Sequence, residues 1–598
     1  MGKKMQEPLA RLRAKMSAEG IDAWLIPTAD YHGSEYVSDY FKFRAWLTGF
    51  TGSAGTAVVT AREAGLWTDG RYFVQAAAQL EDSGFALFKM GQEGVPTVAE
   101  YLKAKLPEEG TLAFDRRVLD AKAGEKLEGA LRGKKIRLLW QEDPAEGLWT
   151  DRPPFPAGPV WMLDGASAGE TADSKLARLR REMERCGATS HLLTSLTDIA
   201  WLLNLRGSDV AYTPVFLANL LIRREQAYLF LNPGAAGEAE LAYLKELGIR
   251  VLPYGEIGKV LQTLKYERLL LEKQAVSYAF LKSLDASVTV LDRRNPTALF
   301  KAVKNETERE NLRRAHIRDG VALCRFLMWV KEAAKSGRVT EREAAEKLDA
   351  LRRGQEGNLG PSFETISAYG ENAAMCHYAA PESGGAVLSA RGLYLVDSGG
   401  QYREGTTDVT RTIALGPLTK EEKEGCTLVA ACMLRLLDVR FPYGCRGLNL
   451  DYAARELLWK RGLDFNHGTG HGVGYLSSVH ERPNAVRWRA GEDLSDNCVL
   501  EEGMVTSDEP GLYVEGKFGV RTENLTLCVK AQKNEFGQFM RFENLTWTPI
   551  DRDTIDPELL EPADRERLNA YNREVYEKLS PHLSREEADW LRDATQPV

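Results

Sequence analysis

The chain has 598 residues, of which 43% are hydrophobic and 27% are charged, and its formal net charge is −8. Single hydrophobic cores stop growing near roughly 250–300 residues, so this length predicts three domains, or two large ones. No apolar run is long enough to cross a bilayer and no signal-peptide pattern opens the chain, so we expect a cytoplasmic protein without membrane contact. The acidic balance offers no electrostatic basis for nucleic-acid binding, so we expect a small or neutral partner.

Eight cysteines are scattered along the chain without CxxC spacing. This pattern argues against a disulfide framework and against a thiolate zinc site. We therefore expect the thiols to be reduced and mostly buried.

Two stretches have the composition of linkers, DRPPFPAGP at 151–159 and DRRNPTALFKAVKN at 292–305. Proline has no backbone N–H and a fixed φ, so proline-rich stretches interrupt regular structure. The predicted domains are therefore 1–155, 156–300 and 301–598.

The first two segments contain similar stretches. LRAKMSAEGIDAWLIPT (12–28) aligns with LRREMERCGATSHLLTS (179–195), and AWLTGF (45–50) resembles AWLLNL (200–205). Each of the two longer stretches has an amphipathic helical pattern that ends near a glycine and leads into an apolar strand, which is typical of α/β domains. We interpret the segments as diverged copies of one α/β domain; the alternative is a chance likeness between two helix–strand units.

The third segment opens with a helical pattern at 305–330, whose early glutamates suit a helix N-terminus. His316 lies within this pattern, and we interpret it as a structural helix residue rather than a ligand. The strand-like, glycine-punctuated stretches that follow contain all of the candidate chemistry.

A first acidic pair lies in VDSGGQYREGTTDVTRT (396–412). Asp397 follows an apolar run and Asp408 precedes β-branched residues, with glycines between them, so a hairpin centred near residues 402 and 403 is predicted. In that hairpin Asp397 and Asp408 become cross-strand neighbours on one face. A lone aspartate there is usually a solvated turn residue, but two close carboxylates indicate a bound cation.

Glycines alternate with other residues in HGTGHGVG (467–474). Each glycine would destabilise a helix by about 1 kcal/mol relative to alanine, so an extended chain is predicted. In that geometry His467 and His471 share one face, and the other face is bare enough for another backbone to approach closely. The nearby HERPN stretch (480–484) does not match the HExxH zinc motif, because Asn484 replaces the second histidine.

A second acidic pair lies in SDEPGLYVEGKFGVRTEN (507–524), where Glu509 precedes a Pro-Gly turn signal and Glu523 lies near a strand-like stretch. An isolated glutamate of this kind is usually exposed. Together with the first pair and one histidine, however, these residues offer four carboxylates and one imidazole, which suits two divalent cations. The predicted ligands are Asp397, Asp408, His471, Glu509 and Glu523.

These motifs carry a resemblance. The third segment is similar to the pita-bread metallopeptidases, the group of methionine aminopeptidase, prolidase and aminopeptidase P, whose ligands follow the order Asp, Asp, His, Glu, Glu. The chain resembles the long, three-domain Xaa-Pro aminopeptidases in particular, through NAAMCHY (372–378), HGTGHGVG, VHERP, SDEPGLY and LTWTPIDRDTIDPELL (545–560). The resemblance implies an α/β (α+β) protein with two creatinase-like N-terminal domains before a pita-bread catalytic domain.

The resemblance also implies the chemistry. It predicts two divalent metal ions, with manganese favoured over cobalt, zinc or iron, and a homodimer. Glu509 would be both ligand and proton shuttle, while His377, His467 and His480 would bind substrate or support the ligands. Tyr513 and Arg521 are weaker candidates; Arg521, two residues from Glu523 on the same face of a predicted strand, could orient a ligand or pair with a carboxylate.

The predicted function is hydrolysis of the first peptide bond in peptides with a free N-terminus and proline second. Two alternatives remain at this point. A prolidase would cleave only Xaa-Pro dipeptides, although its usual single N-terminal domain fits poorly with two. A non-catalytic pita-bread binding protein would be expected to lose metal ligands, whereas all five are present.

Overall fold

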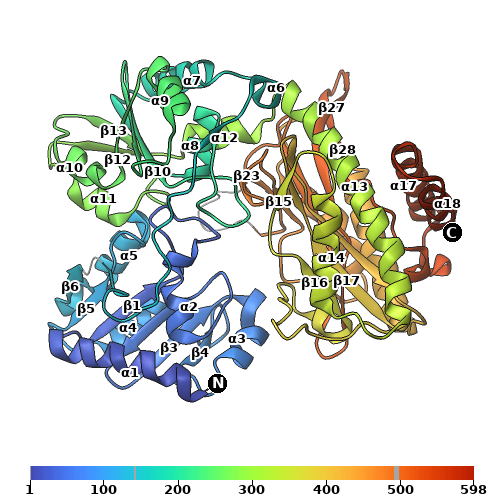
Figure 1. Cartoon of the computed structure of the whole chain (residues 1–598), viewed down its shortest axis with the longest axis horizontal. Helices are drawn as coiled ribbons and strands as arrows, with labels where there is room; N and C mark the ends of the chain where they lie inside the picture. The colour runs from blue at the N-terminus through green and yellow to red at the C-terminus, as the bar shows by residue number, and fades with distance from the viewer. Residues whose placement is uncertain (1, 141–142, 490–496) are drawn as a thin grey trace. The chain divides into compact units, whose positions relative to one another are not determined.

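The computed structural model describes residues 2–140, 143–489 and 497–598, and the chain forms two compact units. The first unit comprises Met1–Leu163 and Glu170–Thr297, and the second comprises Asp164–Gly169 and Ala298–Val598. In Figure 1 the first unit runs from blue to green, and the second, apart from its short Asp164–Gly169 piece, runs from yellow-green to red.

The first unit contains two six-stranded sheets with the same strand order. One sheet has the order β4-β3-β2-β1-β5-β6 and the other β12-β11-β10-β8-β13-β14. The strands of the first sheet are β1 (Ala23–Pro27), β2 (Thr56–Thr60), β3 (Ala64–Thr68), β4 (Ala86–Lys89), β5 (Thr111–Phe114) and β6 (Arg137–Trp140). Those of the second are β8 (Ser190–Leu193), β10 (Ala218–Arg223), β11 (Ala227–Leu231), β12 (Ile249–Pro253), β13 (Arg268–Leu271) and β14 (Thr289–Asp292).

The strand directions match as well as the order. β1 is antiparallel to β2 and parallel to β5, as β8 is antiparallel to β10 and parallel to β13. The remaining neighbours also correspond, with β3 parallel to β4 and β11 parallel to β12. The prediction of two copies of one α/β domain is therefore confirmed at the level of topology.

The helices that were aligned in the sequence end in the same way. α1 (Gly2–Glu19) and α7 (Ala172–Arg185) precede β1 and β8. Gly20 and Gly187 follow them with φ of +66° and +70°, a left-handed conformation that glycine adopts without a Cβ penalty. The other helices of this unit are α2 (Phe43–Thr48), α3 (Phe73–Gln79), α4 (Val98–Lys105), α5 (Ala121–Leu131), α8 (Leu196–Leu203), α9 (Glu238–Glu246), α10 (Ile257–Gln262) and α11 (Tyr278–Ser283).

The two predicted linkers differ in structure. Residues 151–159 contain no helix or strand, as expected, and lead into the short strand β7 (Trp161–Met162), which pairs with β9 (Leu205–Arg206). The stretch 292–305 instead contains the helix α12 (Pro296–Ala302). Its proline is the first helical residue, where the missing N–H costs no hydrogen bond.

In the second unit, helices pack against the strands of several sheets. α13 (Glu306–Lys335) confirms the predicted helix and begins with a capping box between Asn305 and Glu308. The other helices are α6 (Gly165–Ala168), α14 (Glu341–Arg353), α15 (Lys420–Leu437), α16 (Gly447–Trp459), α17 (Pro562–Leu579) and α18 (Arg585–Ala594). α13 and α14 lie side by side in front of the strands (Figure 1).

The strands of the second unit form one six-stranded and several smaller sheets. The large sheet has the order β21-β28-β27-β24-β22-β23, with β21 (Arg440–Pro442), β22 (Gly470–Gly472), β23 (Glu481–Val486), β24 (Val505–Asp508), β27 (Asn524–Asn534) and β28 (Gly537–Asn544). The smaller sheets contain β15 (Asn358–Pro361), β16 (Ile366–Tyr369), β17 (Leu393–Ser398), β18 (Gly400–Tyr402), β19 (Gly405–Thr406), β20 (Val409–Ala414), β25 (Gly511–Val514) and β26 (Phe518–Arg521).

Side-chain alternation decides which face of β17 carries chemistry. Tyr394 and Val396 of β17 pack with Val409 and Ile413 of β20 into the core formed by α13 and α14. Successive side chains of a strand point to opposite faces. Asp397 therefore lies on the face of the sheet that turns away from these helices.

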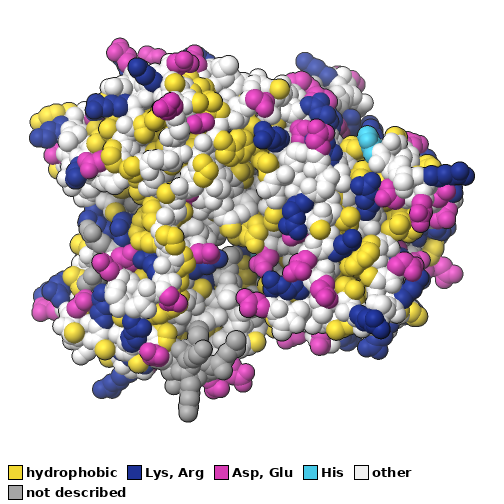
Figure 2. Space-filling model, viewed as in Figure 1, with side chains coloured by type: hydrophobic (Ala, Val, Ile, Leu, Met, Phe, Trp, Pro, Cys, Tyr) yellow, Lys and Arg dark blue, Asp and Glu magenta, His cyan; other side chains and the backbone are white. Residues whose placement is uncertain are grey.

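Several general expectations can be compared with the structure. The eight cysteines, all within the described residues, form no disulfide bonds, and four of them are buried. His316 is buried within α13 and bonds the carbonyl oxygen of Leu312, as expected for a structural residue. Across residues 2–140, 143–489 and 497–598, no helix combines the length and apolar character needed to cross a bilayer. On the face shown in Figure 2, acidic and basic side chains are interspersed.

Candidate metal centre

The first acidic pair lies in a hairpin, but the register differs from the prediction. The turn is centred between residues 403 and 404, because Tyr402 pairs with Gly405. Asp397 is therefore opposite Thr410 and not opposite Asp408. Asp408 is two residues from that partner, so it is a diagonal neighbour of Asp397, which still points to the same face.

The glycines around His471 allow three strands to meet closely. His471 is the central residue of β22, which pairs with β23 and β24. A Cβ at Gly470 would overlap the carbonyl oxygen of Ser507, and one at Gly472 would overlap that of Glu481. The prediction of an extended stretch whose glycines accept a close backbone is confirmed for Gly470–Gly472, whereas residues 467–469 lie outside the strand.

The ring of His471 is oriented for coordination. Its Nδ1 lies 3.0 Å from the carbonyl oxygen of Gly472, so the proton belongs on Nδ1. The lone pair of Nε2 then faces carboxylates, with Oε1 of Glu509 at 3.3 Å and Oδ2 of Asp408 at 3.6 Å. Metal-ligating histidines typically make such a hydrogen bond with the ring nitrogen that does not coordinate the metal.

The second acidic pair is fixed by backbone and hydroxyl contacts. The N–H of Glu509, just after β24, donates to the carbonyl oxygen of Thr469 at 2.8 Å, and Ser507 Oγ donates to its Oε1 at 3.0 Å. Glu523, just before β27, receives a hydrogen bond from Thr410 Oγ1 at 2.7 Å. The contact with Thr410 turns Glu523 toward the hairpin that carries the aspartates, and Glu509 faces His471.

Two carboxylate oxygens of this group have no donor among the described residues, namely Oδ1 of Asp397 and Oε1 of Glu523. Both side chains are buried, with 8% and 1% of each residue exposed. Ligand atoms of Asp408, His471 and Glu523 all lie within 4.8 Å of one another. Because buried carboxylates need a compensating positive charge, this donor set fits divalent cations.

The electrostatics of the carboxylates point the same way. Burial, followed by the negative charges of neighbouring carboxylates, raises the pKa of Asp408 and of Glu523 well above the ordinary range. Burial raises the pKa of Glu509 to about 7, against the opposing effect of Arg521. The neighbouring carboxylates thus disfavour one another's ionised form, and a bound cation would instead favour it.

Arg521 connects this cluster to Tyr513. Its Nη2 donates to Oδ2 of Asp397 at 2.5 Å and its Nη1 donates to the Tyr513 hydroxyl at 2.6 Å. Of the two roles expected for Arg521, the structure shows its pairing with a carboxylate, which is that of a predicted ligand. The expected shared strand with Glu523 is wrong, because Arg521 ends β26 and Glu523 precedes β27.

His467 lies behind the ligands. Its Nδ1 is 2.8 Å from the carbonyl oxygen of Gly468 and its Nε2 is 2.9 Å from the Tyr513 hydroxyl, so both ring nitrogens are engaged. Burial, with the nearby charge of Arg521, lowers the pKa of His467 to about 3. The ring is therefore neutral near pH 7.

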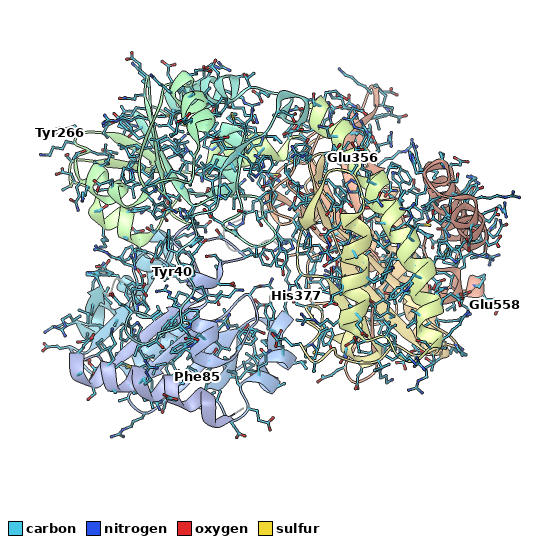
Figure 3. All side chains as sticks on the ribbon, in the orientation of Figure 1. Tyr40, Phe85, Tyr266, Glu356, His377 and Glu558 are labelled. Carbon is cyan, nitrogen blue, oxygen red and sulfur yellow. The ribbon has the colours of Figure 1, made fainter. Side chains whose placement is uncertain are left out.

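The other two predicted histidines lie closer to solvent. The exposed His480 has its ring centroid 4.2 Å from that of His471, at 83° between the planes. His377 is partly exposed and labelled in Figure 3, and it is one of the groups that lower the pKa of His467. The structure thus brings all four histidines and all four carboxylates into one region of the second unit.

Sequence reasoning missed a buried group that holds the His467 loop. Arg455 of α16 donates to Asp451 at 2.7 Å and to the carbonyl oxygen of His467 at 2.7 Å. Asp451 in turn accepts from Thr469 Oγ1 at 2.5 Å. An Asp–Arg pair four residues apart on a helix usually indicates a surface ion pair, so no sequence signal distinguished this one.

Family comparisons agree with this geometry. A sequence model described as "Metallopeptidase family M24" matches residues 310–530, and one for the C-terminal region of that family matches residues 538–598. Models described as "Creatinase/Prolidase N-terminal domain" match residues 8–139 and 151–308. The predicted fold class, two creatinase-like domains followed by a pita-bread domain, is confirmed.

Individual relatives are similar over the whole chain. A protein of Sordaria macrospora named "Probable Xaa-Pro aminopeptidase P" is 37% identical over 98% of both chains, and human "Xaa-Pro aminopeptidase 2" is 36% identical over 99% of this chain and 88% of its own.

Solved structures show the same relationship. The X-prolyl aminopeptidase of Caenorhabditis elegans, described as a cytosolic enzyme with a di-nuclear active site, has a TM-score of 0.93 and 34% identity over 99% of this chain and 100% of its own. An Xaa-Pro dipeptidase of Bacillus anthracis has a TM-score of 0.50 and 25% identity, and it covers 64% of this chain and 99% of its own. The chain therefore belongs to metallopeptidase family M24, among its Xaa-Pro aminopeptidases.

Proposed function

We propose that this protein is a metallo-aminopeptidase that hydrolyses the N-terminal Xaa-Pro bond of peptides. The observation that carries the proposal is the cluster of buried carboxylates around His471, two of whose oxygens lack donors among the described residues. Full-length similarity to Xaa-Pro aminopeptidases supports the reaction and the substrate class. The proposed metal ligands are Asp397, Asp408, His471, Glu509 and Glu523.

Two divalent cations in this donor set would lower the pKa of a water molecule and polarise the scissile carbonyl group. A set of carboxylates and one imidazole without thiolates suits manganese, cobalt, zinc or iron, and manganese is the proposed native metal. The di-nuclear site described for the C. elegans enzyme supports the number of two.

Glu509 is the proposed proton carrier. Its Oε1 lies within reach of both Ser507 Oγ and His471 Nε2, so it faces the centre of the ligand group. From this position beside His471, the carboxylate would take a proton from the nucleophilic water molecule. The same carboxyl group would then protonate the leaving proline nitrogen.

The three remaining histidines divide into two roles. His467 has both ring nitrogens engaged, so it supports Tyr513 and through it Arg521 and Asp397. His377 is partly exposed and His480 is exposed, which suits direct contact with the peptide. There they would position the carbonyl group and stabilise the charge that develops on its oxygen.

Prolidase activity is the alternative from the same family. The similar dipeptidase of B. anthracis covers only 64% of this chain, whereas the C. elegans aminopeptidase covers 99%. The two related sheets of the first unit therefore match the aminopeptidase layout. Hydrolysis of a tripeptide Xaa-Pro-Yaa, compared with a dipeptide Xaa-Pro, separates the two activities directly.

Matched peptides test the proposed function. The enzyme should release only the first residue from Xaa-Pro-Yaa, because a proline nitrogen offers no hydrogen and its ring needs a dedicated pocket. Replacing proline by alanine should lower the rate more than changing the first residue among apolar side chains, and N-terminal acetylation should nearly abolish cleavage. Equal cleavage of the proline and alanine peptides, or internal cuts, would overturn the assignment.

A homodimer and a cytoplasmic location are further parts of the proposal. An exposed aromatic cluster is formed by Tyr452 and Trp459 of α16 and by Trp488, which lies just after β23. The centroids of the two tryptophan rings are 5.8 Å apart. Exposed aromatic groups of this kind are typical of protein interfaces, which supports self-association. Light scattering at several protein concentrations measures the mass directly, and a monomer mass throughout would contradict the dimer.

A further inference from the structure

The segment that carries His377 has little regular structure of its own. It runs from the end of β16 to the start of β17 and contains only the short 3-10 helix η5 (Gly370–Ala374). Ordering irregular chain costs conformational entropy, so other contacts must fix its position. His377 is labelled on this segment in Figure 3.

One buried carboxylate accepts hydrogen bonds from several parts of this segment. Glu341, the first residue of α14, is fully buried. Its Oε1 accepts hydrogen bonds from the backbone N–H of Tyr369 at 2.7 Å and from Asn372 Nδ2 at 2.9 Å. Its Oε2 accepts from the Tyr378 hydroxyl at 2.7 Å and from the N–H of Ala386 at 2.8 Å.

The backbone around Glu341 reinforces the same contacts. Its N–H donates to the carbonyl oxygen of Ala386 at 2.9 Å, and its own carbonyl oxygen accepts from Ser367 Oγ at 2.6 Å. Gly385 has a φ of +78°, and a Cβ there would overlap Oε2 of Glu341. The helix N-terminus adds a favourable dipole for the negative charge.

The segment that carries His377 packs against β26 and Tyr513, next to the metal centre. A Cβ at Gly519 of β26 would overlap the carbonyl oxygen of Ala373, so β26 and η5 are in close contact. The thiol of Cys376 forms a hydrogen bond with Tyr513, which also bonds Arg521. Displacing this segment would therefore move His377 relative to the proposed ligands.

We propose that Glu341 is a positioning residue whose carboxylate fixes the His377 segment against the metal centre. The inference rests on the proposed function, because His377 acts there on the substrate. Glu341 is remote from the ligands in sequence and acts only through the segment that it holds. A misplacement of about 1 Å at a reacting group can cost on the order of 100-fold in rate.

Glu341→Gln tests this role with little change in shape. An amide nitrogen donates and cannot accept, so one pair of the four hydrogen bonds is lost. We expect two metals to remain bound and kcat/KM toward Xaa-Pro-Yaa to fall by about 10- to 100-fold. Tyr378→Phe removes a single bond and should give a smaller loss in a protein that folds normally.

Tyr369→Phe is the matched control. The Tyr369 hydroxyl contacts Ser389 and Arg391 and not Glu341, while the backbone N–H that does bond Glu341 is unchanged. This variant should stay within about two-fold of the parent rate, since it leaves all four donors to Glu341 in place. A loss in Tyr369→Phe equal to that in Tyr378→Phe would contradict the proposal.

A double-mutant cycle separates positioning from general stability. Once His377→Ala has removed the group that is positioned, adding Glu341→Gln should lower kcat/KM by no more than about two-fold further. Losses that simply multiply would overturn the proposal. So would a Glu341→Gln variant with a lower Tm and an unchanged kcat/KM.

Hydrogen exchange gives a readout that does not depend on activity. In Glu341→Gln, backbone amides of 370–380 should exchange at least about 10-fold faster, while those of 393–398 keep their rates. Unchanged exchange in 370–380 would overturn the inference whatever the enzyme cleaves. If the parent protein does not cleave Xaa-Pro peptides, the proposed function fails, and the exchange experiment still decides the role of Glu341 in holding the segment.

Discussion

Removing the metal ions should make the second unit sensitive to pH, because Glu509 would then carry an uncompensated buried charge. Burial raises its pKa from the usual 4.5 to about 7. The folded metal-free protein therefore binds more protons than the unfolded chain in this window, so its stability falls as pH rises from 4.5 through 7. At about 1.4 kcal/mol for each pH unit, the loss is roughly 3 kcal/mol. The raised pKa values of Asp408 and Glu523 act in the same direction.

Glu509→Gln removes the charge and keeps the size of the side chain. Both proteins are first treated with a chelator to remove metal. Between pH 5 and pH 8, we expect the free energy of unfolding of the second unit to decrease by about 3 kcal/mol more in the parent than in Glu509→Gln. Denaturant titration at both pH values measures the difference. Glu515 is exposed and lies in the turn between β25 and β26, close to Glu509 in sequence. Glu515→Gln is therefore the matched control and should behave like the parent. Equal pH dependence of the parent and Glu509→Gln would refute the reasoning.

Three further predictions address other parts of the site. Asp408→Ala should lose metal, measured by elemental analysis, and with it all hydrolysis; full activity without metal would contradict it. His377→Ala should keep two metals but lose on the order of 10²–10³ in kcat/KM; a loss of metal as complete as that in Asp408→Ala would contradict its role as a substrate-binding residue. The carboxylate of buried Glu481 pairs with Nζ of Lys301 at 3.2 Å and with Nζ of Lys304 at 2.5 Å, and both lysines are buried. Glu481→Gln removes this shared charge and should lower the free energy of unfolding, measured by thermal unfolding, by about 3–5 kcal/mol. A decrease below about 1 kcal/mol would contradict this prediction and show that other groups compensate.

The amino-acid sequence by itself determined the local patterns of the site. An apolar run, β-branched residues and the glycines between them predicted the hairpin around residues 397 and 408, and the glycines around His471 predicted a strand that another backbone approaches. The repeated helix–glycine–strand pattern predicted the two related sheets of the first unit. These features depend on side-chain periodicity and on backbone conformations available only to certain residues, which neighbouring positions reveal.

Only the tertiary structure decided how those elements meet. The register that places Asp397 opposite Thr410 depends on where the chain turns, and a shift of the turn by one residue changes each partner by two. Arg521 reaches Asp397 across 124 positions of sequence, and Glu341 holds a segment that begins 28 positions later. Hydrogen bonds between such distant residues leave no periodic trace along the chain, because their geometry is set by the packing of whole elements and not by neighbouring side chains.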